Sequence, residues 1–412
     1  MDSFIARQPI FDTLQKVYGY ELLFRSGLDN VFHSSDPNQA TSKVLTDSFS
    51  LFGMSTLTGG KMGFINITRD ILLQDYIFLI PKDEIVLEIL ENIQPDAEVI
   101  NACERLKEAG YTLAMDDFVY SDSYKPLIDL ADFIKVDFLQ TGKAERTALL
   151  ERCSSNGIRF LAEKVENLET FDEAKRIGYS FFQGYFFSKP TILSRKDIPK
   201  FKLHYLRILQ ETHRPEMNFN RLGEYIKQEV SLSYKLLRYI NSAYFGLRNT
   251  ITSLKQALVL LGEREIKNWI SLLALAGMGD DKPEELAIQA VIRAKFCQSL
   301  APYAGLGRKA EDLFLLGLLS LIDAFLDRPM VEILKEIPVD DEIKRAILGG
   351  DSSLGNFYQF VLAYEKGEWE KVTKQGLQLG IDEAVPPRLY LAAVEWGQKC
   401  FQEDSKTKGQ KG

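Results

Sequence analysis

The sequence predicts an α/β domain in the first half of the chain, a parallel barrel of the (β/α)₈ type, followed by an all-α domain. Short β-branched and aromatic runs alternate with helical stretches up to about residue 190. The alternation of strand-like and helical segments ends at SKPTILSRKDIPKF, residues 188–201, and beyond this segment apolar residues recur at helical spacing. The length of 412 residues is also typical of two domains.

The apolar runs of the first half are interpreted as buried strands. They are MGFINIT, EIVLEIL, YTLAMDD, DFIKVDF, IRFLAEKV and YSFFQGYFF. Between them lie stretches such as AEVINACERLKEAG, which has apolar residues at helical spacing and a glycine at its C-terminal end. This many strand–helix units favour a closed barrel over an open sheet. No glycine-rich nucleotide-binding loop follows any of the strands.

The second half is predicted to be helical. The segment SYKLLRYINSAYFG places on one helical face Leu236, Leu237, Ile240 and Tyr244. Ser253 and Gln256 have the spacing of a capping box that opens the next helix. We therefore expect the barrel domain over residues 1–195 and the helical domain over residues 200–400. The polar tail, residues 401–412, is predicted to be disordered.

Composition narrows the function classes. The net charge is −8 and the acidic excess lies in the first half, so charge gives no support for nucleic-acid binding. The longest apolar run, residues 313–326, contains Asp323 and is too short to cross a bilayer, and the N-terminus lacks the pattern of a signal peptide. We expect a cytoplasmic protein without membrane contact. A basic stretch, residues 196–250, is interpreted as a solvated helix surface, with RNA or protein binding as the alternative.

Polar side chains lie at the C-terminal ends of the predicted strands, where a parallel barrel opens into one shared mouth. They are Glu21, Asn66, Glu88, Asp116, Asp117, Lys135, Asp137, Glu163, Glu166 and Gln183. A charge inside or beside an apolar run is costly to bury unless it is paired or binds a metal. Taken singly, each residue could be solvated, salt-bridged or a helix cap, but their recurrence on successive strands favours a common site.

An oxygen-rich set of ligands, with no histidine or cysteine nearby in sequence, suits Mg²⁺ or Mn²⁺ rather than Zn²⁺. The adjacent carboxylates Asp116 and Asp117 could serve two ions. Two ions a few ångströms apart are a known device for in-line displacement at phosphorus. We therefore predict a site for two divalent cations.

Residues 1–195 resemble the EAL domain, a family of cyclic di-GMP phosphodiesterases with a modified (β/α)₈ barrel. The motif that names the family stands here as YELLFR, and the later motifs follow in order as FINIT, LEILE, DDF, IKVD, AEKVE and FQGYFF. The resemblance implies metal ligands at Glu21, Asn66, Glu88, Asp116 and Asp117. It implies a general base at Glu163, a catalytic lysine at Lys135, supporting roles for Glu166 and Asp137, and substrate contacts from Gln8, Arg25 and Gln183.

The resemblance also implies a reaction, in which cyclic di-GMP is opened to linear 5′-pGpG by metal-assisted hydrolysis, and a homodimer formed through the barrel. Three departures from the family pattern bear on this. Where the family has EAL, this chain has ELL, and where the family has the loop DDFGTGYS, this chain has DDFVYSDS. The glycine of the family motif EGVE is replaced here by Lys164. They leave a second hypothesis open: a cyclic di-GMP receptor of impaired catalysis, whose helical domain relays the signal to a protein partner.

Residues 200–400 resemble the HDOD domain, a helical relative of the HD phosphohydrolases, through LLRYINSAYFGLRNTITSLKQALVLLG. No histidine follows His213, so a His–Asp metal dyad cannot be built inside this domain. We therefore expect the helical domain to regulate or to bind a protein partner rather than to hydrolyse a phosphate. The combination resembles the EAL–HDOD signalling proteins of bacteria.

Overall fold

The computed structural model divides the chain into two compact units. The first comprises Met1–Lys189 together with Phe360–Gly412, and the second comprises Pro190–Gln359. The residues that the structure describes are 3–26, 54–74, 77–78, 80–153, 157–188, 200–212, 217–227, 233, 236, 240–241, 251, 253–278, 281–337 and 339–408.

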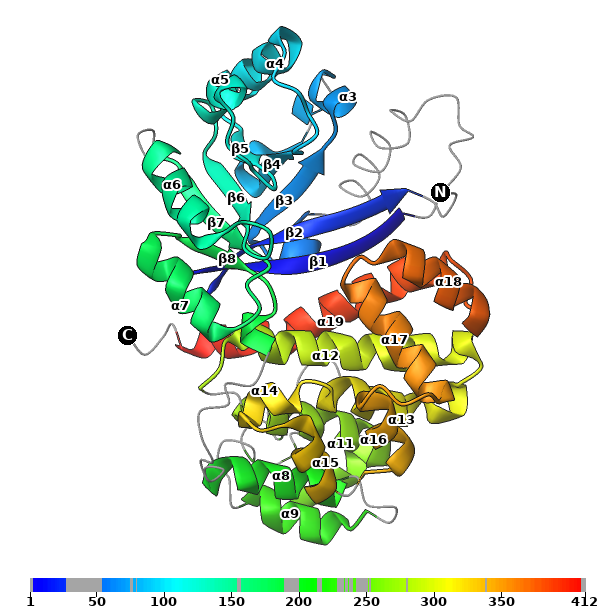
Figure 1. Ribbon diagram of the computed structural model, residues 1–412. Coiled ribbons are helices and arrows are strands. Elements are labelled where there is room, and N and C mark those ends of the chain that lie inside the picture. The colour runs from blue at the N-terminus through cyan, green and yellow to red at the C-terminus, as the bar shows by residue number, and fades with distance from the viewer. Residues whose placement is uncertain are drawn as a thin grey trace. The chain divides into compact units, whose positions relative to one another are not determined.

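A closed barrel of eight strands forms the first unit, with the strands in sequential order around the ring (Figure 1). They are β1 (Ser3–Asp12), β2 (Val17–Ser26), β3 (Met62–Ile67), β4 (Ile85–Ile89), β5 (Thr112–Met115), β6 (Phe133–Asp137), β7 (Arg159–Glu163) and β8 (Phe181–Gln183). The predicted barrel is confirmed. Its modification is β1, which is antiparallel to both neighbours because a short turn joins it to β2 as a hairpin.

Helices connect the strands on the outside of the ring (Figure 1). They are α2 (Met54–Thr58), α3 (Arg69–Leu72), α4 (Ala97–Glu108), α5 (Lys125–Ile128), α6 (Lys143–Cys153) and α7 (Leu168–Ile177), with the 3₁₀ turns η2 (Lys82–Glu84), η3 (Asp122–Tyr124) and η5 (Phe186–Ser188). The Asp96 carboxylate caps α4 by accepting from Val99 N, and Gly178 ends α7 in the left-handed conformation.

Apolar side chains fill the interior of the barrel. One cluster joins seven strands and consists of Ile10, Phe64, Val86, Ala114, Phe133, Leu161 and Phe181. The rings of Phe64 and Phe133 meet edge to face with centroids 5.5 Å apart. The barrel is therefore a packed core, and polar chemistry is confined to the strand ends.

The chain returns to the first unit at its C-terminal end. Helix α17 (Ser353–Glu365) crosses the boundary at Phe360, and α18 (Trp369–Leu379) and α19 (Val385–Lys408) follow it. Helix α19 packs against β1 and α2. The division therefore differs from the expected ranges 1–195 and 200–400, because helical periodicity does not reveal which core a helix joins.

The structure also differs from the prediction of a disordered tail over residues 401–412. Helix α19 continues to Lys408, and residues 409–412 lie outside the described part. A helix that already exists extends without a new nucleation step, and Glu and Lys are good helix formers.

Helices make up the described part of the second unit, as predicted. They are α8 (Lys200–Thr212), α9 (Phe219–Lys227), α11 (Leu254–Met278), α12 (Glu284–Leu300), α13 (Ala310–Leu319), α14 (Ile322–Leu326), α15 (Met330–Glu336) and α16 (Asp341–Ile347), with the 3₁₀ turns η6 (Ala301–Ala304) and η7 (Gly307–Lys309). Helix α12 packs closely on α13, where a side chain at Gly317 would overlap the Ala294 backbone. Among the described helices, none has the length and hydropathy needed to cross a membrane.

Two local predictions for this unit can be followed in the structure. Gln256 N donates to Ser253 Oγ over 3.4 Å, so Ser253 caps the start of α11. Leu236 and Ile240 of the predicted apolar face are buried. Leu237 and Tyr244 of the same face lie outside the described residues.

Candidate active site

A buried lysine lies where the predicted polar residues converge. Lys135, on β6, has a side chain that is 1% exposed. Its Nζ lies 2.7 Å from Glu88 Oε1, 2.7 Å from Asp116 Oδ1, 3.0 Å from Glu163 Oε1 and 3.7 Å from Glu21 Oε2. All four contacts are ion pairs. We call these four acids and Lys135 the carboxylate cluster.

Strand register aligns two acids of the cluster with neighbouring predicted site residues. Asn66 on β3 is opposite Glu88 on β4, and Asp137 on β6 is opposite Glu163 on β7. Asp116 follows β5 directly, and its backbone N–H donates to Ile89 O on β4. The ends of parallel strands therefore present their side chains at the same level of the barrel.

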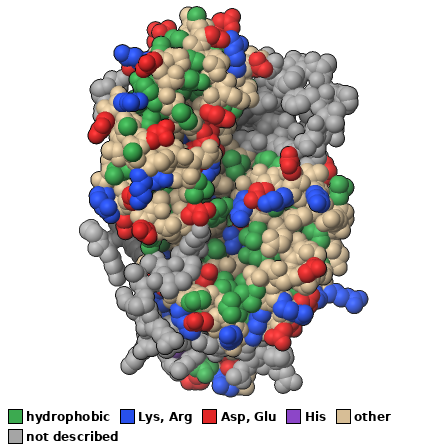
Figure 2. Space-filling view, viewed as in Figure 1, with side chains coloured by type: hydrophobic (Ala, Val, Ile, Leu, Met, Phe, Trp, Pro, Cys, Tyr) green, Lys and Arg blue, Asp and Glu red, His purple; other side chains and the backbone are tan. Residues whose placement is uncertain are grey.

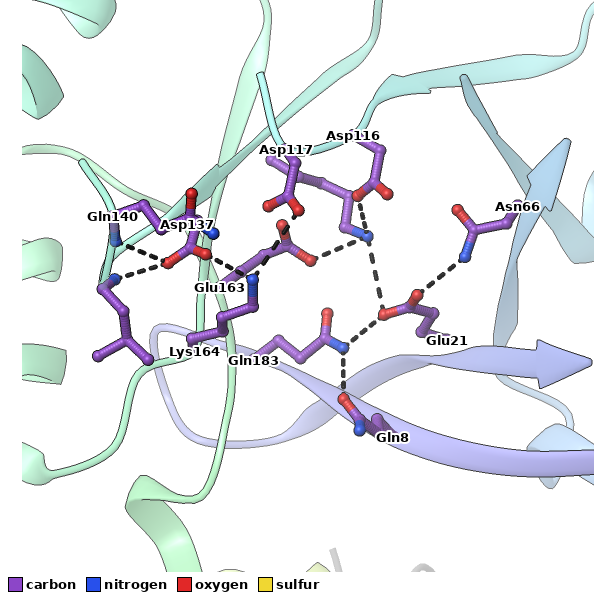
Figure 3. Close-up of polar contacts among 12 residues, drawn as sticks. Gln8, Glu21, Asn66, Asp116, Asp117, Asp137, Gln140, Glu163, Lys164 and Gln183 are labelled. Atoms are coloured by element: carbon purple, nitrogen blue, oxygen red, sulfur yellow. Dashed lines mark hydrogen bonds and ion pairs between the residues drawn. The ribbon is translucent and has the colours of Figure 1, made fainter. Parts of the chain in front are cut away.

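Two side-chain amides fix the position of Glu21 (Figure 3). Asn66 Nδ2 donates to Glu21 Oε1 over 3.0 Å, and Gln183 Nε2 donates to Glu21 Oε2 over 2.6 Å. Gln183 Nε2 also donates to Gln8 Oε1 over 3.0 Å, so Gln8 on β1 is linked to Glu21 through Gln183. Both amides orient Glu21 toward the cluster with their donors and keep their oxygens for other partners.

A second group of charges lies beside the cluster (Figure 3). Lys164 Nζ is 2.5 Å from Asp137 Oδ2 and 3.8 Å from Asp117 Oδ2. Asp137 Oδ1 accepts from Leu139 N over 2.6 Å and from Gln140 N over 3.1 Å. Asp117 and Lys164 both have positive φ, 41° and 54°, which is uncommon for residues other than glycine.

Burial and mutual repulsion control the protonation of the cluster. Burial raises the pKa of Glu163 to about 8, and Asp116 and Glu21 add to the rise while Lys135 opposes it. Burial also raises the pKa of Glu88 well above its usual range. The surrounding carboxylates overcome desolvation of the ammonium and hold the pKa of Lys135 well above its usual value.

The donor set fits a hard divalent cation. Several buried oxygens have no hydrogen-bond partner, namely Asn66 Oδ1, Glu88 Oε2, Asp117 Oδ1 and Gln183 Oε1. Carboxylate and amide oxygens are the ligands that Mg²⁺ and Mn²⁺ prefer. Within the described residues, no three acidic, histidine or cysteine side chains have the spacing of a complete metal site, and the Lys135 ammonium lies among the acids of the cluster.

Two domain families match the chain. The EAL domain matches residues 52–190 and the HDOD domain matches residues 198–327. YuxH of Bacillus subtilis (strain 168), an uncharacterized protein, is 37% identical over 404 residues, which cover 96% of this chain and 98% of that relative. This chain belongs to the EAL–HDOD family.

Two further similarities accompany this assignment. A protein of Vibrio cholerae serotype O1, named cyclic di-GMP phosphodiesterase CdgJ, is 32% identical over 399 residues and is covered over 92% of its length. A standalone EAL protein from Vibrio cholerae O395, solved in a c-di-GMP-bound form, is 24% identical with a TM-score of 0.36, over 46% of this chain and 92% of that chain.

The structure of this EAL–HDOD protein brings most of the predicted site residues together, but not all. Arg25 is in β2, and its side chain lies outside the described part. Glu166 is exposed in the loop after β7. The sequence interpretation gave no role to Lys164, although its replacement of the glycine in EGVE was the signal that could have drawn attention to it.

The face of the barrel seen in Figure 2 carries charges of both signs. Acidic and basic side chains intermix over its coloured residues in Figure 2, and neither sign forms a continuous field there. The concentrated charge is the buried group at the strand ends, which the barrel core holds in place.

Proposed function

We propose that this EAL–HDOD protein hydrolyses cyclic di-GMP to linear 5′-pGpG. The observation that carries the proposal is the convergence of four carboxylates, contributed by different strands and the residue after β5, on the Lys135 ammonium. The name of CdgJ, which matches along nearly the whole chain, describes that protein as a cyclic di-GMP phosphodiesterase. Both support the same substrate class.

Mg²⁺ or Mn²⁺ would be held by Glu21, Asn66, Glu88, Asp116 and Asp117, the set for which the sequence predicts two ions. When bound, the cations supply positive charge to a phosphate oxygen and lower the pKa of water. Gln183 and Asn66 keep Glu21 in place through hydrogen bonds of 2.6 and 3.0 Å to its carboxylate.

Glu163 accepts a proton from the attacking water. Lys135 lies 3.0 Å from Glu163 Oε1, where its ammonium orients the water and offsets negative charge that develops at phosphorus. The new P–O bond forms as the P–O3′ bond breaks. The leaving 3′-oxygen takes up a proton, so the ring opens to a 5′-phosphate and a 3′-hydroxyl.

The remaining predicted residues take supporting parts in this proposal. Gln8, Arg25 and Gln183 contact the substrate, Asp137 anchors the loop after β6 through Leu139 N and Gln140 N, and Glu166 stabilises the loop after β7. A homodimer through the barrel and a protein partner for the helical unit stay predictions.

A second candidate is a cyclic di-GMP receptor without turnover. The observation that favours it is the pairing of Asp117 with Lys164, which draws one of the proposed metal ligands toward an ammonium. In that case the substrate would bind and persist.

The deciding experiment mixes the full-length protein with cyclic di-GMP and Mg²⁺ or Mn²⁺ and separates the nucleotides by chromatography. We expect 5′-pGpG from the wild type and a loss of about 10²–10⁴-fold in rate for Glu163→Gln. The control is Glu145→Gln, an exposed acid on α6. Binding of the dinucleotide by calorimetry, with no product from the wild type, would identify the receptor instead.

A further inference from the structure

We propose that Lys164 supplies a fixed positive charge at Asp117, so that the site binds one divalent cation tightly rather than two. This inference rests on the metal-assisted hydrolysis proposed above. It concerns the number of cations and the residue that decides it.

The two adjacent aspartates face different ammonium groups (Figure 3). Asp116 Oδ1 lies 2.7 Å from Lys135 Nζ inside the carboxylate cluster. Asp117 Oδ2 lies 3.8 Å from Lys164 Nζ, on the side of Asp137. The two carboxylates therefore do not form one shared ligand pair, and only Asp116 joins Glu21 and Glu88 around Lys135.

Lys164 is held firmly where a glycine would be the default residue. Its φ of 54° lies in the left-handed region, which side chains with a Cβ rarely adopt. Its ammonium is 2.5 Å from Asp137 Oδ2, and that carboxylate is itself fixed by Leu139 N and Gln140 N. A strained backbone that carries an anchored charge beside a site is a reason to assign that charge a function.

An ammonium in this position competes with a second cation. Like charges a few ångströms apart repel strongly in a partly buried site, and the repulsion doubles for a divalent ion. The other oxygen, Asp117 Oδ1, has no hydrogen-bond partner, so it stays available as a ligand once the ammonium is removed. We expect Lys164 to weaken binding of a second cation by at least about 100-fold.

The test is a Mn²⁺ titration of the full chain, with free Mn²⁺ measured by electron paramagnetic resonance. We expect one tightly bound Mn²⁺ per chain in the wild type and two in Lys164→Met, which removes the charge but keeps a side chain. Lys164→Gly, which also relieves the positive φ, should likewise bind two. The control Lys143→Met removes an ammonium paired with Glu173, away from the cluster, and should still bind one.

Two tight ions in the wild type, or one in both Lys164 variants, would overturn the inference and leave the proposed hydrolysis standing. No tight Mn²⁺ in the wild type would overturn it together with the metal-assisted part of that function. Hydrolysis of cyclic di-GMP, followed in the same samples, keeps the two failures distinct. Circular dichroism of each variant establishes that it is folded.

Discussion

Replacing Lys135 with methionine should destabilise the barrel unit when no divalent cation is present. The ammonium is the cation at the centre of the carboxylate cluster, with three acidic oxygens within 3.0 Å and a fourth at 3.7 Å. Methionine has a similar length and fills the space, so the loss is electrostatic rather than a cavity. Removing one partner of a buried ion pair typically costs about 3–5 kcal/mol.

Proton uptake limits this loss in a pH-dependent way. The pKa of Glu88 and that of Glu163 are already raised by burial, and both rise further without the ammonium. A carboxyl whose folded pKa lies above its unfolded value binds protons better in the folded state, so the protein that contains it becomes less stable as the pH rises. The difference between Lys135→Met and wild type should therefore be larger at pH 8 than at pH 6.

The assay is urea unfolding in EDTA, followed by circular dichroism. With a slope of about 2 kcal/mol per molar urea, the expected loss lowers the midpoint by about 1.5–2.5 M. Mn²⁺ should restore Lys135→Met more than it stabilises the wild type, since an added cation then replaces the missing charge.

The matched control is Lys202→Met, which removes another buried ammonium. Lys202 Nζ contacts Asp281 Oδ1 at 2.7 Å and Phe325 O at 2.8 Å in the second unit. Mn²⁺ should not rescue this variant. The reasoning is refuted if Lys135→Met unfolds at the wild-type midpoint in EDTA, or if Mn²⁺ rescues the two variants equally.

Two further substitutions test the surroundings of the cluster by urea unfolding. Burial raises the pKa of Asp137, but the Lys164 contact and the amides of Gln140 and Leu139 outweigh burial and lower the pKa overall. The stabilisation that the Asp137 carboxylate gives the fold is therefore present above about pH 3.9, and it is lost as the pH falls through the lowered folded pKa. Asp137→Asn should thus lose about 2 kcal/mol at pH 7 and little at pH 2, and an equal loss at both would contradict this. At Gly184, where φ is 143°, an added Cβ would lie 2.2 Å from Val165 O, so Gly184→Ala should lose about 3 kcal/mol. Gly142→Ala, with nothing within 4 Å of the added atom, is the control, and equal midpoints for the two would exclude the steric explanation.

The barrel could be predicted because each parallel strand is buried on both faces and so appears as a short apolar run. The hairpin β1–β2 was not among those runs, since polar and apolar residues mix along RQPIF and YELLFR. Its antiparallel β1 follows from a turn too short for a crossover helix. The return of α18 and α19 to the barrel unit could not be predicted either, because an amphipathic pattern defines a face but not its partner.

The candidate site was predictable to the extent that it depends on strand ends. Glu88, Lys135 and Glu163 lie in or directly after apolar runs, and register pairs Glu88 with Asn66 and Glu163 with Asp137. What each side chain contacts was not predictable. Neither the position of Lys135 among the acids nor the turn of Lys164 toward Asp117 follows from spacing, because each depends on backbone angles and rotamers.

The buried ammonium explains how such a site can fold before it binds a cation. Four carboxylates that converge without a counter-charge would repel one another and raise each other's pKa until some were protonated. Lys135 offsets that repulsion from within, yet a buried ion-pair network is often no more stable than an apolar core of the same volume. Stability alone therefore does not account for the arrangement. The arrangement is instead explained as a site that keeps oxygen ligands assembled at the mouth of the barrel, ready for a cation of higher charge.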